Sequence, residues 1–481
     1  MLYELFTWTW LRGLSERDDR RVTLRDISAA DWDALAVPGV DAVWLMGVWQ
    51  RSPFGRRVAL SDPSFAAATA AVLPDAREQD VVGSAYCIRG YTVDDRLGGD
   101  AGLAVARREL ADRGLALILD FVPNHVAPDH PWVTTNPEFF VRLAPGEEPV
   151  PPEAWIDTRH GPVARGRDPF FPPWPDVAQL DPMSPGLRDA VVDVLAAIAE
   201  RCDGVRCDMA MLLLDDVAEW TWGARLQPRR PLPYWVEVVE RVRERHPEFL
   251  LIAEAYWDLE ASLLAQGLDR CYDKELYDRL AHRDAASVRQ HLTADPAWQS
   301  KLVRFLENHD EPRAAATFAP DRGRAAALAL LTLPGTPLLY RGQLEGRRLR
   351  TPVHLGREPA EPPDPQVEAF WYQLLATVRD ERVREGDWEL LEVRGSPGNT
   401  SQEHVLAWRW SRHLVVINYS GEAADGLVMV GPAFAGARWR LEDVLTGAAF
   451  DRSGDDLLAE GLYVQLEPYA VHLLRHVRMS D

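Results

Sequence analysis

Eight short segments rich in apolar and β-branched residues recur along the chain, and helical patterns separate most of them. Strands that alternate with helices form parallel sheets, and eight such strands close into a (β/α)8 barrel. The sequence therefore predicts an α/β fold built on a TIM barrel. We expect its strands at Leu2–Trp10, Asp41–Gly47, Ala116–Val122, Gly204–Ala210, Leu250–Tyr256, Cys271–Tyr277, Leu302–Asn308 and Thr336–Gly342.

Two parts of the chain depart from this alternation. The connection from Val126 to Asp181 is too long for a simple crossover and is rich in proline and aromatic residues, which indicates a small subdomain. From about Gly386 onward, alternating segments such as His404–Trp410 predict a terminal antiparallel β-sandwich. We therefore assign residues 1–125 and 183–385 to the barrel, residues 126–182 to a short inserted subdomain after the third strand, and residues 386–481 to the sandwich.

Four segments end an apolar, strand-like run in a carboxylate or an imidazole. They are DFVPNH (120–125), GVRCD (204–208), IAE (252–254) and ENHD (307–310). Active sites of TIM barrels lie at the carboxyl ends of the strands, so we expect Asp208, Glu254 and Asp310 to meet there. Carboxylates grouped in this way are typical of glycosidic-bond chemistry.

In this order the four segments resemble the motifs of the α-amylase family of retaining glycoside hydrolases. The resemblance implies that Asp208 is the nucleophile, Glu254 the general acid/base and Asp310 the carboxylate that stabilises the transition state. It also implies substrate-binding roles for Tyr86, as an aromatic platform under the sugar ring, and for His125, Arg206 and His309. Taken singly, each of these residues has an ordinary structural explanation, such as a helix cap or a buried ion pair; the joint pattern favours catalysis.

The chemistry sets requirements on the surroundings of the two reacting carboxyl groups. A retaining enzyme holds them roughly 5 to 5.5 Å apart, one as nucleophile and one as acid/base. Arg206 lies two residues before Asp208, on the same face of a strand, so we expect its guanidinium to keep Asp208 ionised. Glu254 lies in the apolar segment LLIAEAYW, which predicts an environment that keeps it protonated.

Two further residues are expected to support the site rather than to react. Asp120 is predicted to orient Arg206 or to cap its strand, and Asn124 matches a calcium-ligand position of many α-amylases. One side-chain amide cannot hold calcium, which needs six to eight oxygen ligands, and the loop from Leu11 to Arg21 lacks alternating Asp and Asn ligands. We therefore predict no cofactor and no required metal.

Departures from the family motifs bear on the substrate. Met211 and Leu212 replace a Lys-His pair of many α-amylases, and Cys87 replaces the Asp that follows the platform aromatic in many α-glucosidases. The expected substrate is a small α-linked glucoside, an oligosaccharide or a short α-glucan. Alternatives are a transglycosylase or a phosphorylase, such as one that uses sucrose, and an inactive binding subunit. The arginine-rich loop from Arg341 to Arg357 is either a solvated surface or an anion subsite.

Composition excludes several partners. The net charge of -21 argues against nucleic acid and against an anionic membrane surface. The four cysteines form no CxxC pair, the segment Met1–Trp10 does not look like a signal peptide, and no apolar run is long enough to span a bilayer. We therefore expect a cytoplasmic enzyme, and the sequence gives no basis for predicting its oligomeric state.

Overall fold

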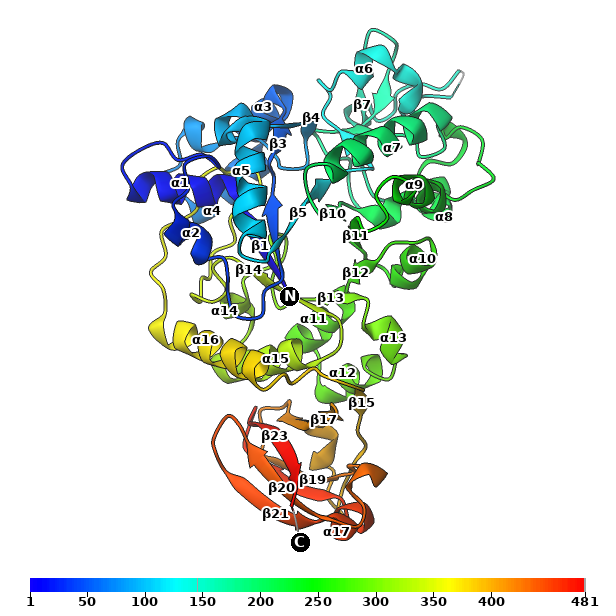
Figure 1. The fold of residues 1–481 in the computed structure, drawn as a ribbon. Coiled ribbons are helices and arrows are strands. Elements are labelled where there is room, and N and C mark those ends of the chain that lie inside the picture. Colours follow the sequence, from blue (N-terminus) through cyan, green and yellow to red (C-terminus); the bar gives the residue numbers. More distant parts are fainter. Residues whose placement is uncertain (145, 480–481) are drawn as a thin grey trace. The chain divides into compact units, whose positions relative to one another are not determined.

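The computed structural model describes residues 1–144 and 146–479 and contains a closed barrel of eight parallel strands (Figure 1). The strands follow the order β1-β14-β13-β12-β11-β10-β5-β2 around the barrel. They are β1 (Leu2–Phe6), β2 (Ala42–Met46), β5 (Ala116–Phe121), β10 (Gly204–Cys207), β11 (Leu250–Ala253), β12 (Arg270–Tyr272), β13 (Leu302–Arg304) and β14 (Thr336–Tyr340). Each overlaps one predicted segment, so the predicted TIM barrel is confirmed.

The helix between β5 and β10 shows how local sequence sets an element. Helix α7 (Pro185–Ala199) begins with a proline at its first position, and the Ser184 hydroxyl accepts a hydrogen bond of 3.4 Å from the Leu187 amide. Leu187 and Val191 lie on its buried face. This helix follows the inserted segment and leads directly into β10, the strand that carries Arg206 and the predicted nucleophile.

The segment between β5 and α7 is built from short pieces. Two short antiparallel pairs join β6 (His125–Val126) with β9 (Ala178–Gln179) and, as a hairpin, β7 (Trp155–Ile156) with β8 (Val163–Ala164). Helix α6 (Trp132–Thr135) precedes the second hairpin. A core cluster that includes Val141, Trp155 and Trp222 packs this inserted region against the end of α8 (Asp215–Trp222).

The C-terminal part forms the predicted antiparallel β-sandwich. A six-stranded sheet has the order β15-β17-β18-β23-β20-β21, and a three-stranded sheet has the order β16-β19-β22. A shared core of aliphatic side chains, among them Val416, Val428 and Leu441, fills the sandwich. The strands are β15 (Glu389–Leu390), β16 (Val393–Arg394), β17 (Val405–Arg409), β18 (His413–Asn418), β19 (Ala424–Val428), β20 (Arg438–Asp443), β21 (Ala449–Ser453), β22 (Leu462–Leu466) and β23 (Val471–Arg478).

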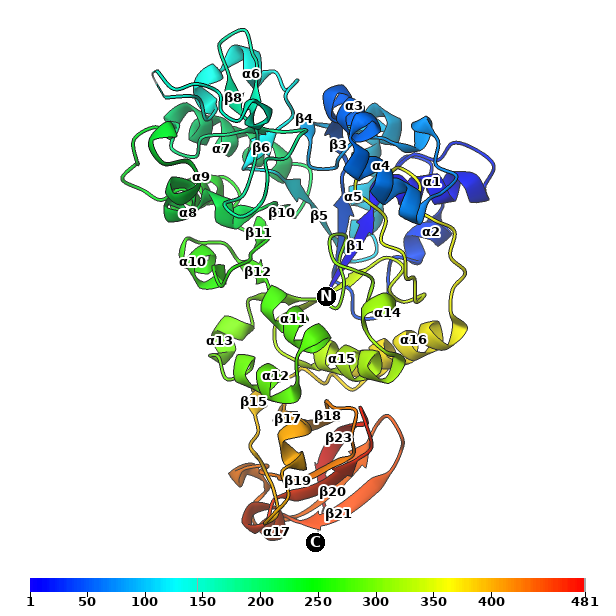
Figure 2. The ribbon, with the colours of Figure 1, turned by 180° about the vertical axis from the view of Figure 1, so that it is seen from behind.

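Two compact units divide the chain. The first comprises Met1–Tyr272 with Leu349–Ala360, and the second comprises Asp273–Arg348 with Glu361–Asp481. The second unit holds β13, β14 and the sandwich, together with α11 (Lys274–His282), α12 (Ala285–His291), α15 (Pro320–Thr332) and α16 (Pro365–Asp380). Within it, α12 and α15 contact the sandwich strands β17 and β18 (Figure 2). The predicted domain boundaries stay predictions.

Candidate active site

One buried arginine joins two of the three predicted catalytic carboxylates. Strand β10 places Arg206 and Asp208 on one side, and Arg206 Nη1 lies 2.5 Å from Asp208 Oδ1. Arg206 Nη2 lies 2.8 Å from Glu254 Oε1, just past the end of the neighbouring strand β11. All three side chains are buried, with exposed fractions of 4% or less. The first unit therefore brings Asp208 and Glu254 together around a single guanidinium.

The surroundings of Arg206 keep it charged. Burial disfavours the guanidinium, but attraction to Glu254 and Asp208 outweighs that cost and holds the pKa of Arg206 well above its ordinary value. The guanidinium carbon also lies 5.1 Å from the ring centroid of Tyr86 and 5.4 Å from that of Trp44. The arginine is thus a permanent cation between two acids, with the predicted platform Tyr86 beside it.

Glu254 has a more polar environment than the sequence predicted. Besides Arg206, the Met209 amide donates to Glu254 Oε2 at 2.5 Å and the Tyr256 hydroxyl donates to Oε1 at 2.9 Å. The expectation of an apolar setting was wrong in this respect. The apolar residues around Glu254 in the sequence describe only its own strand, whereas two of the donors, Arg206 and Met209, come from β10 and the turn after it. Met209 has a φ of 46°, a left-handed conformation, at the turn where its amide meets the carboxylate.

His125 lies beside the predicted nucleophile. Its Nε2 is 4.0 Å from Asp208 Oδ2, and the side chain is 4% exposed. Burial lowers the pKa of His125 to about 3, so the imidazole is neutral and can donate one N–H. The neighbouring Asn124 Oδ1 accepts from Gln179 Nε2 at 2.9 Å, which ties the end of β6 to β9.

Asp120 lies next to Arg206 in the pairing of β5 with β10, as expected for a supporting residue. Its Oδ1 accepts from the Trp44 indole at 3.0 Å, and its Oδ2 accepts from the Gly47 amide at 2.6 Å. The carboxylate is completely buried. It therefore fixes the end of β2 and the Trp44 ring that borders Arg206.

The second unit holds the remaining predicted residues in one turn after β13. His309 Nε2 lies 3.0 Å from Asp310 Oδ2. His309 is buried, whereas the Asp310 side chain is 41% exposed. Asn308 Oδ1 accepts from the amides of Asp310 and Glu311, both at 2.9 Å. A shared site of Asp310 with Asp208 and Glu254 stays a prediction.

The structure also reveals an exposed aromatic cluster of Phe170, Trp220 and Trp257. The Phe170 ring lies 5.1 Å from the Trp220 ring and 4.8 Å from the Trp257 ring, centroid to centroid. Asp168 Oδ1 accepts from the amides of Phe170 and Phe171, which holds this part of the loop in place. In the sequence, Trp220 and Trp222 follow the fourth predicted strand, where they could flank an acceptor sugar, and Trp257 follows Glu254 by three residues. Nothing in the sequence marks Phe170.

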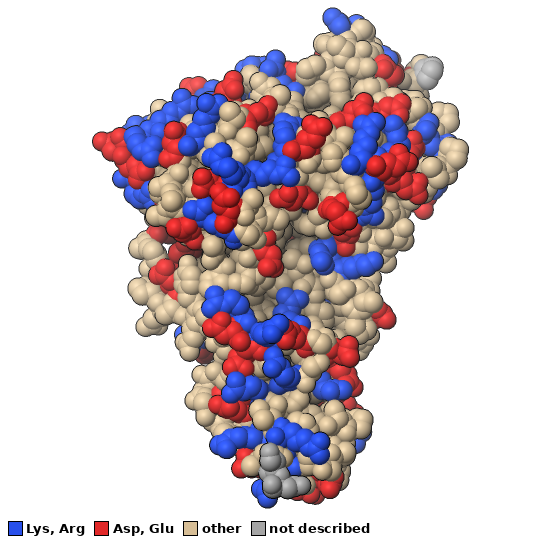
Figure 3. Space-filling model, viewed as in Figure 1, with Lys and Arg blue, Asp and Glu red and all other residues tan. Residues whose placement is uncertain are grey.

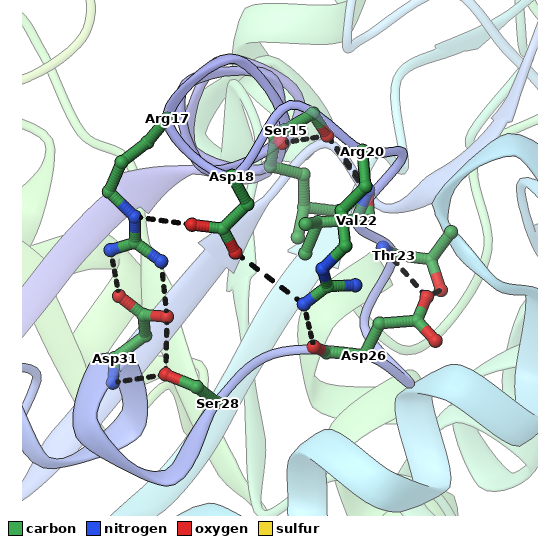
Figure 4. Close-up of polar contacts among 10 residues, drawn as sticks. Ser15, Arg17, Asp18, Arg20, Val22, Thr23, Asp26, Ser28 and Asp31 are labelled. Atoms are coloured by element: carbon green, nitrogen blue, oxygen red, sulfur yellow. Dashed lines mark hydrogen bonds and ion pairs between the residues drawn. The ribbon is translucent and has the colours of Figure 1, made fainter.

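In the segment that follows α1 (Thr7–Arg17), the carboxylates of Asp18, Asp26 and Asp31 accept hydrogen bonds from protein donors (Figure 4). Arg17 contacts Asp31 at 2.5 and 2.8 Å and Asp18 at 2.7 Å, and the bond from Arg17 lowers the pKa of Asp31 to about 2. Asp26 accepts from the Thr23 hydroxyl at 2.6 Å. Among residues 1–144 and 146–479, no cluster of three or more His, Cys, Asp or Glu could hold a metal ion. The prediction of no required metal stays a prediction.

On the face shown in Figure 3, basic and acidic side chains are interspersed, and neither charge forms a broad patch. In the arginine-rich loop, Arg357 pairs with Asp75 and Asp80 at 3.1 Å each, and Arg348 Nη1 donates to the Ala315 carbonyl. These two arginines therefore already have partners within the protein.

Within the described part of the chain, no helix has the length and apolar character to cross a membrane.

Comparison with known proteins assigns the family. Residues 35–351 match the α-amylase catalytic domain, and the chain therefore belongs to the α-amylase family. The sequence is 24% identical over 466 residues to the α-amylase MalA of Haloarcula japonica, covering 91% of this chain and 59% of that protein. It is 24% identical over 307 residues to an α-glucosidase of Culex pipiens, covering 53% of this chain and 51% of that protein. The chain thus spans little more than half the length of these relatives.

Solved structures agree on the fold. The maltogenic α-amylase AmyB of Thermotoga neapolitana superposes with a TM-score of 0.69 at 18% sequence identity, covering 100% of this chain and 99% of that chain. The α-amylase of Geobacillus thermoleovorans, whose structure contains acarbose, gives a TM-score of 0.69 at 17% identity, covering 100% and 98%. At these identities the likeness establishes the architecture and leaves the substrate open.

Proposed function

We propose that this chain is a retaining glycosidase that acts on α-linked glucosides or short α-glucans through a covalent glycosyl-enzyme. The observation that carries the proposal is the buried Arg206, which contacts Asp208 and Glu254 at the ends of neighbouring strands. A nucleophile that must stay ionised needs such a fixed cation. The names of the relatives, α-amylase and α-glucosidase, support an α-glucoside as substrate.

The first chemical step uses the two carboxyl groups in different ways. Asp208 attacks the anomeric carbon while Glu254 gives a proton to the departing oxygen, so the bond to the leaving group breaks as the glycosyl ester forms. The neutral His125 donates its N–H to a hydroxyl of the same sugar. Asp310 binds ring hydroxyls more tightly as the ring flattens, which lowers the barrier selectively.

The second step restores the enzyme. Glu254, now a carboxylate, removes a proton from water, and the new oxygen–carbon bond displaces Asp208 as a free carboxylate. The product keeps the α configuration after two inversions. Met209 and Tyr256 donate to Glu254 throughout, so they hold its carboxyl group in position for both proton transfers.

A second candidate is transfer to a sugar acceptor in place of water. The exposed rings of Phe170, Trp220 and Trp257 favour it, because sugar faces stack on exposed aromatic rings and one of the three, Trp257, follows Glu254 by three residues. Phosphorolysis has less support, since Arg348 and Arg357 of the proposed anion subsite already have protein partners. An inactive binding subunit has the least, because Arg206 and both carboxylates are in place.

A proton NMR time course tests these alternatives. Maltooligosaccharides, sucrose and trehalose are each supplied with and without phosphate, and Asp208→Asn serves as the blank. The proposal predicts free reducing sugar that appears first as the α-anomer, with turnover at least about a thousandfold lower in the blank. New glycosidic signals would indicate transfer, and sugar-phosphate signals phosphorolysis. Release of the β-anomer first would contradict retention.

A further inference from the structure

The loop that carries His309 and Asp310 is closed at its base by a buried ion pair. Glu307 Oε1 lies 2.6 Å from Arg313 Nη1, and the exposed fractions of the two residues are 0% and 2%. The other oxygen of the same carboxylate accepts from the Ala314 amide at 2.5 Å. Residues 307 and 313 therefore join the two ends of a short loop, with Asp310 at its middle.

Arg313 also anchors this loop to the turn after the next strand. Its Nη1 donates to the Arg341 carbonyl at 3.0 Å, and its guanidinium carbon lies 4.3 Å from the ring centroid of Tyr340 at the end of β14. Gly342 has a φ of +96°, and a Cβ there would lie only 2.8 Å from Arg313 Nη2. A side chain at position 342 would therefore clash with the Arg313 guanidinium, which packs directly against the backbone of this turn.

Inside the loop, the turn that presents Asp310 is fixed by its own hydrogen bonds. Asn308, which is fully buried, accepts from the amides of Asp310 and Glu311. The Asp310 side chain is 41% exposed, and its Oδ2 lies 3.0 Å from Nε2 of the buried His309, which belongs to the same turn. Its placement depends on the turn, and the turn depends on the ion pair at the base of the loop.

We infer that the Glu307–Arg313 ion pair positions Asp310 for the reaction; this rests on the proposed function, in which Asp310 stabilises the transition state. Buried ion pairs add little net stability compared with apolar residues of the same size, but their directional bonds specify geometry. A displacement of about 1 Å at a catalytic group can cost about a hundredfold in rate. Glu307 and Arg313 are buried, so they act through Asp310 and are positioning residues.

The test compares Glu307→Gln and Arg313→Lys with the unmodified chain, using α-glucosyl fluoride as donor. Glu307→Gln keeps the size of the side chain and an oxygen that accepts from the Ala314 amide, but it removes the negative charge. Arg313→Lys keeps the positive charge but loses the planar guanidinium with its several N–H donors. We expect kcat to fall about a hundredfold while KM changes less than about threefold. The control Glu381→Gln breaks the ion pair with Arg475, 2.9 Å long, elsewhere in the same unit and should leave kcat unchanged.

A double-mutant cycle separates positioning from a structural role. In an Asp310→Asn background, Glu307→Gln should cost less than about threefold, because its effect passes through Asp310. Amide hydrogen exchange in residues 305–314 should also rise in Glu307→Gln and not in Glu381→Gln. Fully additive losses, or unchanged kcat in both ion-pair variants, would overturn the inference. Absence of turnover of any α-glucoside by the unmodified chain would instead overturn the proposed function itself.

Discussion

At the scale of single residues, burial affects the charge of two neighbouring groups of the site, Arg206 and His125, in different ways. Arg206 remains a cation because attraction to the surrounding carboxylates and tyrosine hydroxyls outweighs the cost of its burial, whereas for His125 burial is the dominant effect and the imidazole loses its charge. The sequence could predict that these residues meet, because each follows a strand in a fixed register. It could not predict the three donors around Glu254, since the Met209 amide meets the carboxylate at a turn in a left-handed conformation.

His125 provides a pH prediction. Burial lowers its pKa from 6.5 to about 3 in the folded chain, so the unfolded chain binds the proton more readily. The corresponding stability is fully present above about pH 6.5 and is lost as the pH falls from 6.5 toward 3. We expect the His125 imidazole signal, assigned with His125→Gln, to show no titration between pH 5 and 8 by NMR. A midpoint near 6.5 would show that the histidine is not held neutral.

At the scale of elements, Gly204 in β10 tests how closely the barrel strands must approach. A Cβ at this position would lie 2.6 Å from the Leu250 carbonyl oxygen and 3.1 Å from the Ile118 side chain. Gly204→Ala should therefore lower the free energy of unfolding by about 1–3 kcal/mol in urea and also reduce kcat, because the same strand carries Arg206. Gly13→Ala in α1, where nothing lies within 4 Å, should stabilise by about 0.5–1 kcal/mol. Equal effects of both substitutions would refute the argument.

Element boundaries were less predictable than element order. The segment Leu2–Trp10 was predicted as one strand, but β1 ends at Phe6 and α1 begins at Thr7. A short apolar run has the same pattern in a buried strand and in a buried helix, so its sequence alone cannot locate the change. The contact of Phe170 with Trp220 and Trp257 was beyond prediction for another reason: it joins three elements that are distant in the sequence.

At the scale of the whole molecule, the second unit links barrel helices to the sandwich through specific hydrogen bonds. The Trp410 indole donates to the Thr332 carbonyl at 2.7 Å, and the Tyr419 hydroxyl donates to the Leu280 carbonyl at 2.6 Å. Arg289 adds a bond of 2.6 Å to the Val405 carbonyl. These contacts join α15, α11 and α12 to the sandwich, so the two parts should unfold together.

Calorimetry tests this coupling. Trp410→Phe removes the indole donor of the Thr332 carbonyl and should lower the free energy of unfolding by about 1–3 kcal/mol. Tyr419→Phe leaves the Leu280 carbonyl with a second donor, Arg322 Nε at 3.1 Å, and should cost about 0.5–1.5 kcal/mol. The matched control is Tyr463→Phe, which removes a hydroxyl from a residue that is 55% exposed. It should change the free energy of unfolding by less than about 0.5 kcal/mol. We expect one transition for these helices and the sandwich in the unmodified chain. A sandwich transition that is unaffected by Trp410→Phe would show that the parts are independent.

The most direct test of the whole account is to trap the glycosyl-enzyme. A 5-fluoro-α-glucosyl fluoride carries a good leaving group but forms an intermediate that hydrolyses slowly, so the covalent species accumulates. The account predicts that mass spectrometry finds one fluoroglucosyl group on the peptide that contains Asp208, and none in Asp208→Asn. Turnover without any label, or a label on Asp310, would contradict the assignment of Asp208 as the nucleophile.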